Sequence, residues 1–246
     1  MFVKTAGLLV IPAAVAALAG CGSSAQQSQP DAAPAGTAVA QAAQAPQGGS
    51  AARFSFTAVQ LRRGLLGHIN GTAPVSPAQA GPYSSLADVK ASKKSMHGVV
   101  VSPAKCAQAS ATGLTAKQLA SAPSAIEDFR VGQNGVSEVL MAASGAAASS
   151  ALGREVPLGC SHYSAVFKGK KYTYAVKDSW VRGIGDRAHI VNVKTTSGRS
   201  RGDAWTIAYR GHGIVGSITV DGPDASEAAV RQLGKQSYTY AVSRLS

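Results

Sequence analysis

The chain is poor in acidic residues, in aromatic residues and in long hydrophobic runs. Its 246 residues include 12 Asp and Glu against 24 Lys and Arg, and only 6% are aromatic. The apolar run at residues 6–18 is thirteen residues long and contains Pro12. A helix that crosses a bilayer needs about 20 apolar residues without such a break. We therefore expect no membrane-spanning anchor.

The sequence also lacks the motifs of the common catalytic chemistries. It has no Gly-x-Ser-x-Gly elbow, no Ser-x-x-Lys with its partner motifs, no His-Glu-x-x-His and no phosphate-binding loop. The five histidines stand far apart, without a carboxylate or cysteine at metal-ligand spacing. The expectation is a protein that is not an enzyme, with no catalytic residue, no metal site and no cofactor.

A short motif ends the apolar run. Leu18-Ala19-Gly20-Cys21 follows the run directly, and Lys4 precedes it, which is the order of a secretory signal. The motif resembles the lipobox of exported bacterial lipoproteins, which implies a diacylglyceryl group on Cys21 and cleavage of residues 1–20. Two or three acyl chains hold a protein stably on a membrane. We predict a lipid anchor at the extracytoplasmic face of the cell membrane; the alternative is an ordinary signal peptide with a chance cysteine.

The segment that follows Cys21 predicts a tether. Residues 22–52 consist almost wholly of Ala, Gln, Pro, Ser and Gly, with Asp31 as their only charge. Such a segment buries too little apolar surface to offset its ordering entropy. As a flexible chain its 31 residues would reach roughly 30 Å. Residues 21–52 are therefore predicted to be a disordered tether, and residues 53–246 a single extracellular domain.

The chain has only three cysteines. Once Cys21 is lipidated, Cys106 and Cys160 remain in an oxidising compartment, so we expect them to pair with each other. A redox centre or thiolate nucleophile is the alternative, but redox pairs usually sit as Cys-x-x-Cys.

The charge balance is strongly basic, with a formal net charge of +12. An exported protein meets no nucleic acid, so the expected counterparts are anionic lipid headgroups, wall polyanions or an acidic ligand. The cluster Lys168, Lys170 and Lys171, beside a turn at Gly169, is the candidate contact with an anionic surface. Lysines that merely keep the domain soluble are the alternative.

Hydrophobic periodicity predicts an α+β fold, a largely antiparallel sheet packed with helices. Trp205, Ile207 and Tyr209 alternate with polar residues before Gly211-His212-Gly213, and alternation resumes at residues 214–220, which predicts a hairpin. Asp224 and Glu227 have the spacing of a capping box for a C-terminal helix. That helix carries the stripe Val230, Leu233, Ser237, Tyr240, Ala241 and Leu245. Further strands are expected at residues 172–176, 189–194, 54–66 and 98–102, a strand broken by a turn at 129–139, a glycine turn at 183–188, and helices at 115–122 and 141–152.

The order of these features resembles a known family. The features that carry the resemblance are the lipobox, the tether, Val101-Ser102-Pro103-Ala104-Lys105-Cys106, the second cysteine before a strand, the turn at 183–188 and the closing hairpin and helix. With these features in this order, the chain resembles small lipoproteins and PknH-like extracellular sensor domains of high-GC Gram-positive bacteria. The resemblance covers the chain from about Val99 to its end. It implies a cleft-bearing α+β domain that binds a ligand outside the cell, with no established chemistry to transfer. The chain departs from the kinase sensors, which have two cysteine pairs and a kinase domain.

Aromatic residues beside cations suggest where a ligand would bind. Tyr172 and Tyr174 share one face of their strand, and Trp180 and Trp205 lie near basic residues that include Arg182. Aromatic walls with a cation at the rim suit an anionic or amphipathic ligand; core packing is the alternative for all of them. The predicted function is therefore a lipoprotein that binds or senses a ligand at the cell surface. The alternative is an accessory lipoprotein that docks on a membrane or cell-wall protein complex.

Overall fold

The computed structural model describes residues 55–108, 119–143, 148, 152 and 155–246. Within them, nine strands form one antiparallel sheet in the order β1-β3-β4-β9-β8-β7-β6-β5-β2. The predicted antiparallel sheet is thus confirmed. The predicted α+β class holds only in part, because the described residues are mostly β. The predicted signal peptide, Cys21 and tether lie outside this part of the chain. None of its helices is long and apolar enough to cross a membrane.

Four tight hairpins build most of the sheet. Each joins its strands through two residues that include a glycine at positive φ, which matches the twist of the flanking strands. The turns are Gly132-Gln133, Lys168-Gly169, Gly198-Arg199 and His212-Gly213. The strands are β3 (Pro123–Val131), β4 (Asn134–Ala142), β5 (His162–Phe167), β6 (Lys170–Val181), β7 (Arg187–Ser197), β8 (Ser200–Gly211) and β9 (Ile214–Asp221). The hairpin expected after Trp205 is confirmed.

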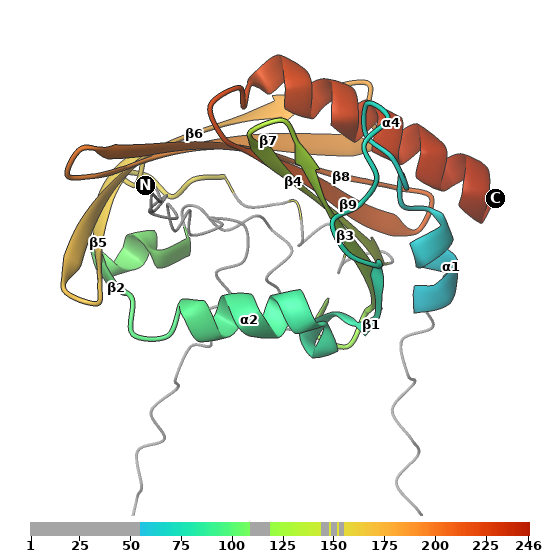
Figure 1. Cartoon of the computed structure of the whole chain (residues 1–246), viewed down its shortest axis with the longest axis horizontal. Coiled ribbons are helices and arrows are strands. Elements are labelled where there is room, and N and C mark those ends of the chain that lie inside the picture. The colour runs from blue at the N-terminus through green and yellow to red at the C-terminus, as the bar shows by residue number, and fades with distance from the viewer. Residues whose placement is uncertain (1–54, 109–118, 144–147, 149–151, 153–154) are drawn as a thin grey trace, which may run out of the picture. The chain divides into compact units, whose positions relative to one another are not determined.

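The two edges of the sheet come from neighbouring parts of the chain. The edge strands β1 (Gln79–Pro82) and β2 (Val100–Ser102) are joined by the 3₁₀ turn η1 (Tyr83–Ser85) and helix α2 (Ala87–Ser95). Figure 1 shows the sheet as a strongly curved layer, with α2 running between its two edges on one side. A second 3₁₀ turn, η2 (Ala104–Gln108), follows β2.

Helix α4 (Glu227–Leu245) packs on the opposite side of the sheet. Most of the predicted apolar stripe is present: Val230, Leu233, Ser237 and Ala241 are buried, and Leu245 packs on the same cluster. Tyr240, also predicted, is only half-buried and is not part of the cluster. The sheet contributes Ile190, Ile207, Tyr209, Ile214, Ile218 and Val220 to this cluster. We call this side of the sheet the α4 face.

The other side, the α2 face, carries two smaller clusters. Val89 of α2 packs with Ile126, Val139, Met141 and Val215. The second cluster surrounds the Cys106–Cys160 disulfide and includes Tyr163, Val176, Val191 and Val193. Because both faces are covered, the central strand β9 is buried over most of its length. All three clusters lie within residues 55–246, so this part of the chain contains its own core.

The strand expected at residues 54–66 is wrong, because helix α1 (Ala58–Arg63) occupies its centre. Thr57 and Gln60 form a capping box in which each side chain binds the other residue's backbone N–H. The cap satisfies the first free N–H groups and outweighs the β propensity of the segment. Leu61 then lies fully buried in the α4-face cluster.

Other details of the predicted elements also differ. Ser226, not Asp224, caps α4, since the Ala229 N–H donates to its Oγ at 3.2 Å. Glu227 instead forms an ion pair with Arg231. The strand expected at 129–139 is two paired strands, and residues 141–142 end β4 rather than begin a helix. Most of the helices expected at 115–122 and 141–152 lies outside the described residues, and the strand expected at 98–102 is confirmed as β2.

Candidate functional site

A cleft crosses the strands of the sheet. Its volume is about 1710 Å³, and residues from β3, β4, β9, β8, β7, β6 and β5 line it in turn. We call it the transverse groove. Its lining includes Ser102, Arg130, Gly135, Tyr163, Tyr174, Lys194, Thr195, Arg201, Gly202, Asp203 and Asp221.

Strand register explains why the groove runs across the sheet. Arg130 is paired with Gly135, and Gly135 with Asp221. On the other half of the sheet, Gly202 is paired with Thr195, Thr195 with Tyr174, and Tyr174 with Tyr163. Paired residues project on the same side of a sheet, and alternation places all of these on the α2 face. Six interstrand spacings of about 4.8 Å separate β5 from β3, so the row extends about 29 Å along the sheet.

Two aromatic rings form one end of this row. Tyr163 and Tyr174 are stacked, with their centroids 4.8 Å apart and their planes inclined by 12°. Tyr163 is buried beside the disulfide, whereas Tyr174 is half-buried. Burial, with the neighbouring tyrosines, raises the pKa of Tyr174 to about 12. The phenol is therefore a neutral hydrogen-bonding group at physiological pH.

Opposite charges form the other end. Burial raises the pKa of Asp221, and the Arg130 guanidinium nearby opposes that rise. The Asp221 carboxylate lies against Gly135: a Cβ built on that glycine would be 2.5 Å from Asp221 Oδ1. A larger residue in place of Gly135 would displace the carboxylate from the groove.

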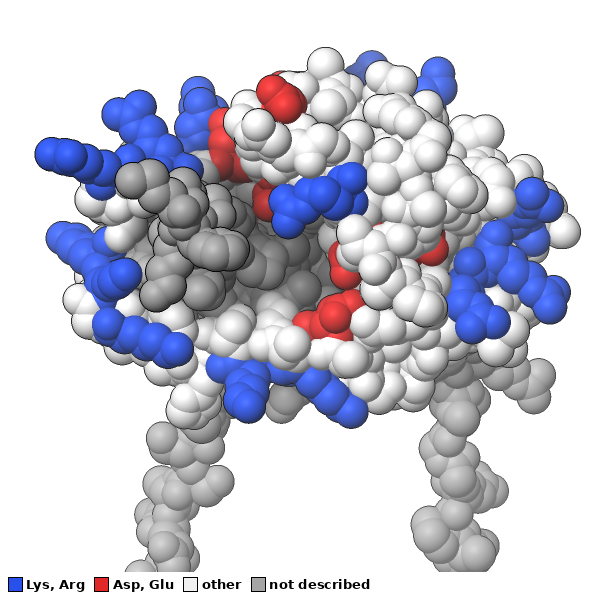
Figure 2. Space-filling model, viewed as in Figure 1, with Lys and Arg blue, Asp and Glu red and all other residues white. Residues whose placement is uncertain are grey.

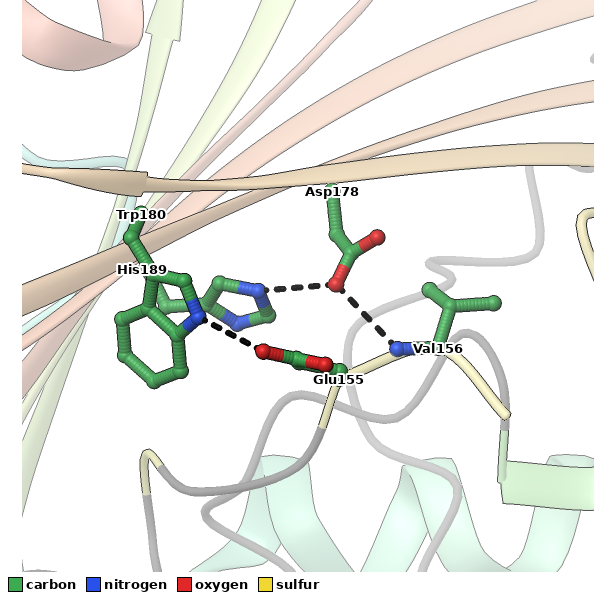
Figure 3. A network of polar contacts seen from close by, with 5 residues as sticks. All are labelled: Glu155, Val156, Asp178, Trp180 and His189. Carbon is green, nitrogen blue, oxygen red and sulfur yellow. Dashed lines mark hydrogen bonds and ion pairs between the residues drawn. The ribbon is translucent and has the colours of Figure 1, made fainter. Parts of the chain in front are cut away.

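A polar network lies farther along β6 on the same face (Figure 3). Asp178 Oδ2 is 3.0 Å from His189 Nε2 and accepts the Val156 N–H at 3.1 Å. The Trp180 indole N–H donates to Glu155 Oε1 at 3.1 Å, and the centroid of its ring lies 4.5 Å from that of His189. Together with the disulfide, these bonds hold the segment that begins at Glu155 against the sheet.

The aromatic residues proposed from the sequence do not form one site. Tyr174 lines the groove, and Tyr172 projects from the same face of β6 but is not part of the lining. Trp180 belongs to the network of Figure 3, and the cation above its ring is Arg187, whose Cζ lies 3.7 Å from the ring centroid, rather than the exposed Arg182. Trp205 packs on the α4-face cluster, on the other side of the sheet. Sequence periodicity placed the β6 aromatics on one face but could not supply the pairing between strands.

The structure also contains a buried carboxylate pair that the sequence analysis missed. Glu127 and Glu138 are paired across β3 and β4. Glu138 Oε2 accepts the Leu66 N–H at 2.9 Å, Glu127 Oε2 accepts the Gly67 N–H at 3.2 Å, and the Ser237 hydroxyl donates to Glu138 Oε1. Burial raises the pKa of Glu138 to about 7. An acidic residue inside each of two apolar strands was the signal that could have found them.

Within the described residues, no three His, Cys, Asp or Glu side chains come together in a way that could hold a metal ion. The predicted Cys106–Cys160 disulfide is confirmed, with both residues fully buried. Lys168, Lys170 and Lys171 are exposed on and beside the β5–β6 turn.

No protein-family model matches the chain, and no curated protein matches it. Among solved structures it is similar to an uncharacterized protein of Mycobacterium smegmatis, described as an Rv0999 ortholog, at 18% identity and a TM-score of 0.37, covering 61% of this chain and 77% of that one. It is also similar to the extracellular domain of PknH from Mycobacterium tuberculosis, at 12% identity and a TM-score of 0.41, covering 69% and 82%. Both scores lie below 0.5, so neither likeness assigns a function to this chain.

Proposed function

We propose that this protein is a lipid-anchored, extracytoplasmic binding protein that holds an extended polar ligand in the transverse groove and performs no chemistry on it. Two sets of paired residues on the α2 face carry the proposal, one from Arg130 to Asp221 and the other from Gly202 to Tyr163. Asp221 is paired with Ala204, two residues from Gly202. A site that crosses seven strands suits a linear ligand rather than a compact one.

The groups along the row favour a ligand rich in hydroxyl groups. Arg130 can only donate hydrogen bonds and the ionised Asp221 can only accept them, whereas Thr195 and Tyr174 do both. Hydroxyl groups of a saccharide chain also do both, so they can satisfy every one of these partners. An acyl chain would leave buried polar groups unpaired, which costs about 1–3 kcal/mol for each group. We therefore infer that the ligand is a linear oligosaccharide or a glycan segment.

Two observations support a location outside the cytoplasm. The Cys106–Cys160 disulfide is of the kind that persists in oxidising compartments. The lipobox ending at Cys21 supplies the anchor. The groove favours a ligand-binding protein over an accessory protein that docks on a membrane complex, because the latter needs an exposed apolar patch rather than a cleft.

A glycan array that presents linear neutral oligosaccharides, with fatty acids and polyphosphate as comparators, tests this function. We expect retention on linear saccharides, and a loss of at least about tenfold in affinity for Tyr174→Leu, which removes the phenol hydroxyl, and for Asp221→Leu, which removes the carboxylate acceptor. Tyr172→Leu is the matched control, because it removes a tyrosine from the same face of β6 outside the groove.

Preference for fatty acid or polyphosphate would contradict the proposed ligand class. Equal binding by the Tyr174 and Tyr172 variants would show that the groove is not the site. Mass spectrometry of small molecules extracted from the purified protein gives an independent answer, since a groove occupied in the cell should yield saccharide.

A further inference from the structure

A second surface adjoins one end of the groove and differs from it in composition. The β5–β6 turn and the β7–β8 turn lie at the same end of the sheet, because Thr173 of β6 is paired with Thr196 of β7 near both turns. The first turn carries Lys168 and Lys170, and the second carries Arg199. Figure 2 shows basic side chains gathered at this end, over β5 and the neighbouring strands of Figure 1.

No acidic residue of the two hairpins lies near their tips. Residues 162–177 and 187–202 contain no Asp or Glu. The nearest carboxylate along the chain after the second turn, Asp203, forms an ion pair with Lys194 and accepts a hydrogen bond from Asn192. Lys168, Lys170, Lys171, Arg199 and Arg201 are all exposed. The tips of two neighbouring hairpins therefore form a surface of one sign, which we call the hairpin patch.

Apolar side chains adjoin the hairpin patch. Val100 of β2 is paired with Val166 of β5, and Val166 with Lys171 of β6, so the three project on one side of the sheet. Val100 is 66% exposed and Val166 is 43% exposed. Cations beside exposed apolar side chains suit the boundary between headgroups and acyl chains, where the cations meet phosphate and the apolar groups leave water. A dissolved polyanion would use only the cations.

We propose that the hairpin patch, with Val100 and Val166, docks the domain on the anionic lipid headgroups of the membrane. Of the patch residues, Lys171 and Arg201 also line the groove, whereas the turn residues Lys168, Lys170 and Arg199 do not. The docked domain would lie with the β5–β6 and β7–β8 turns against the membrane instead of moving freely on a tether.

Sedimentation of residues 53–246 with vesicles tests the docking without the lipid anchor. We expect binding to phosphatidylglycerol-containing vesicles at low salt, little binding to pure phosphatidylcholine, and loss of binding as the Debye length falls to about 3 Å near 1 M salt. The triple variant Lys168→Asn, Lys170→Glu, Arg199→Glu should lower the affinity on the order of 100-fold, about fivefold or more for each basic residue lost. Asn suits position 168, where φ is +46°.

A matched variant controls for net charge. Arg62→Glu, Arg63→Gln and Lys235→Glu change the charge by the same amount on α1 and α4, and we expect at most a few-fold effect. Val100→Thr with Val166→Thr should weaken vesicle binding while leaving binding to soluble polyphosphate unchanged. Intact circular dichroism and an oxidised disulfide establish that each variant is folded.

The proposal would be overturned if the wild type failed to bind anionic vesicles at low salt, or if it bound polyphosphate but not vesicles. It would also be overturned if the triple and matched variants lost the same amount of vesicle affinity. Because the triple variant leaves the groove lining intact, its saccharide retention should equal that of the wild type. Failure of docking and failure of the proposed function are therefore distinguishable.

Discussion

Glu138 is a buried carboxyl group whose charged form the fold disfavours. It is fully buried between β3, α4 and the backbone at Leu66, and its pKa rises to about 7. Burial is the main cause; the Ser237 hydroxyl and the Leu66 N–H lower the pKa in part, and the Glu127 carboxylate raises it. The folded protein therefore binds a proton at pH values where the unfolded chain has released it.

This residue predicts a pH dependence of stability. A raised folded pKa gives stability that is complete below about pH 4.5 and is lost as pH rises toward 7, so unfolding should require about 3 kcal/mol less at pH 8 than at pH 4 because of Glu138. Urea titrations across this range measure the slope. Glu138→Gln, which stays neutral, should remove most of it, whereas Glu227→Gln on the surface should not; equal slopes in all three proteins would contradict the assignment.

Gly216 has no Cβ and therefore leaves room for the ring of Tyr209. A Cβ at Gly216 would lie 2.2 Å from Cζ of the fully buried Tyr209 ring, whose hydroxyl shares a hydrogen bond with Ser237. Gly216→Ala should therefore destabilise the protein by about 3 kcal/mol or more, through overpacking and the broken hydrogen bond. Thermal unfolding measures this. Gly202→Ala is the control, since its nearest neighbour would be 3.9 Å away; similar losses in both variants would refute the steric explanation.

Among the elements, those with a local signal were predictable. Alternation found the β8–β9 hairpin, and the apolar stripe found α4, because both patterns follow from the geometry of one element. Helix α1 was missed because its capping box, Thr57 with Gln60, is a two-residue signal in a segment of β-like composition. The groove could not be predicted from the sequence, because the pairing of Thr195 with Tyr174 is set by strand register, which depends on contacts between distant segments.

The disulfide joins the turn η2 to the residues just before β5. The two cysteines are 54 residues apart, and closing such a loop contributes about 4 kcal/mol in the chain-entropy model. Cys106→Ser should therefore lower the free energy of unfolding as much as the double variant with Cys160→Ser, because either change removes the same cross-link. Denaturant titrations of the three proteins compare them. Two titratable thiols in the native protein would contradict the prediction.

For the whole molecule, attachment and folding are predicted to be separable. Cys21→Ala should move the protein from the membrane fraction to the medium or wash while its domain stays folded, because every core cluster described lies within residues 55–246. Cell fractionation followed by protease resistance of the released protein measures both properties. Retention in the membrane after this change would show that lipid on Cys21 is not the sole attachment.

The connection between the edge strands acts on the curvature of the whole sheet. A flat sheet of nine strands would separate β1 from β2 by about 38 Å. The chain between them, at about 1.5 Å per step in α2, 2 Å in η1 and 3.4 Å elsewhere, reaches about 43 Å when drawn straight. The segment could therefore span a flat sheet only when almost fully extended, so it limits how far the two edges can separate. Residues inserted at 96–99 would lengthen this connection and allow the sheet to flatten and the groove to widen, although none of residues 96–99 lines the groove.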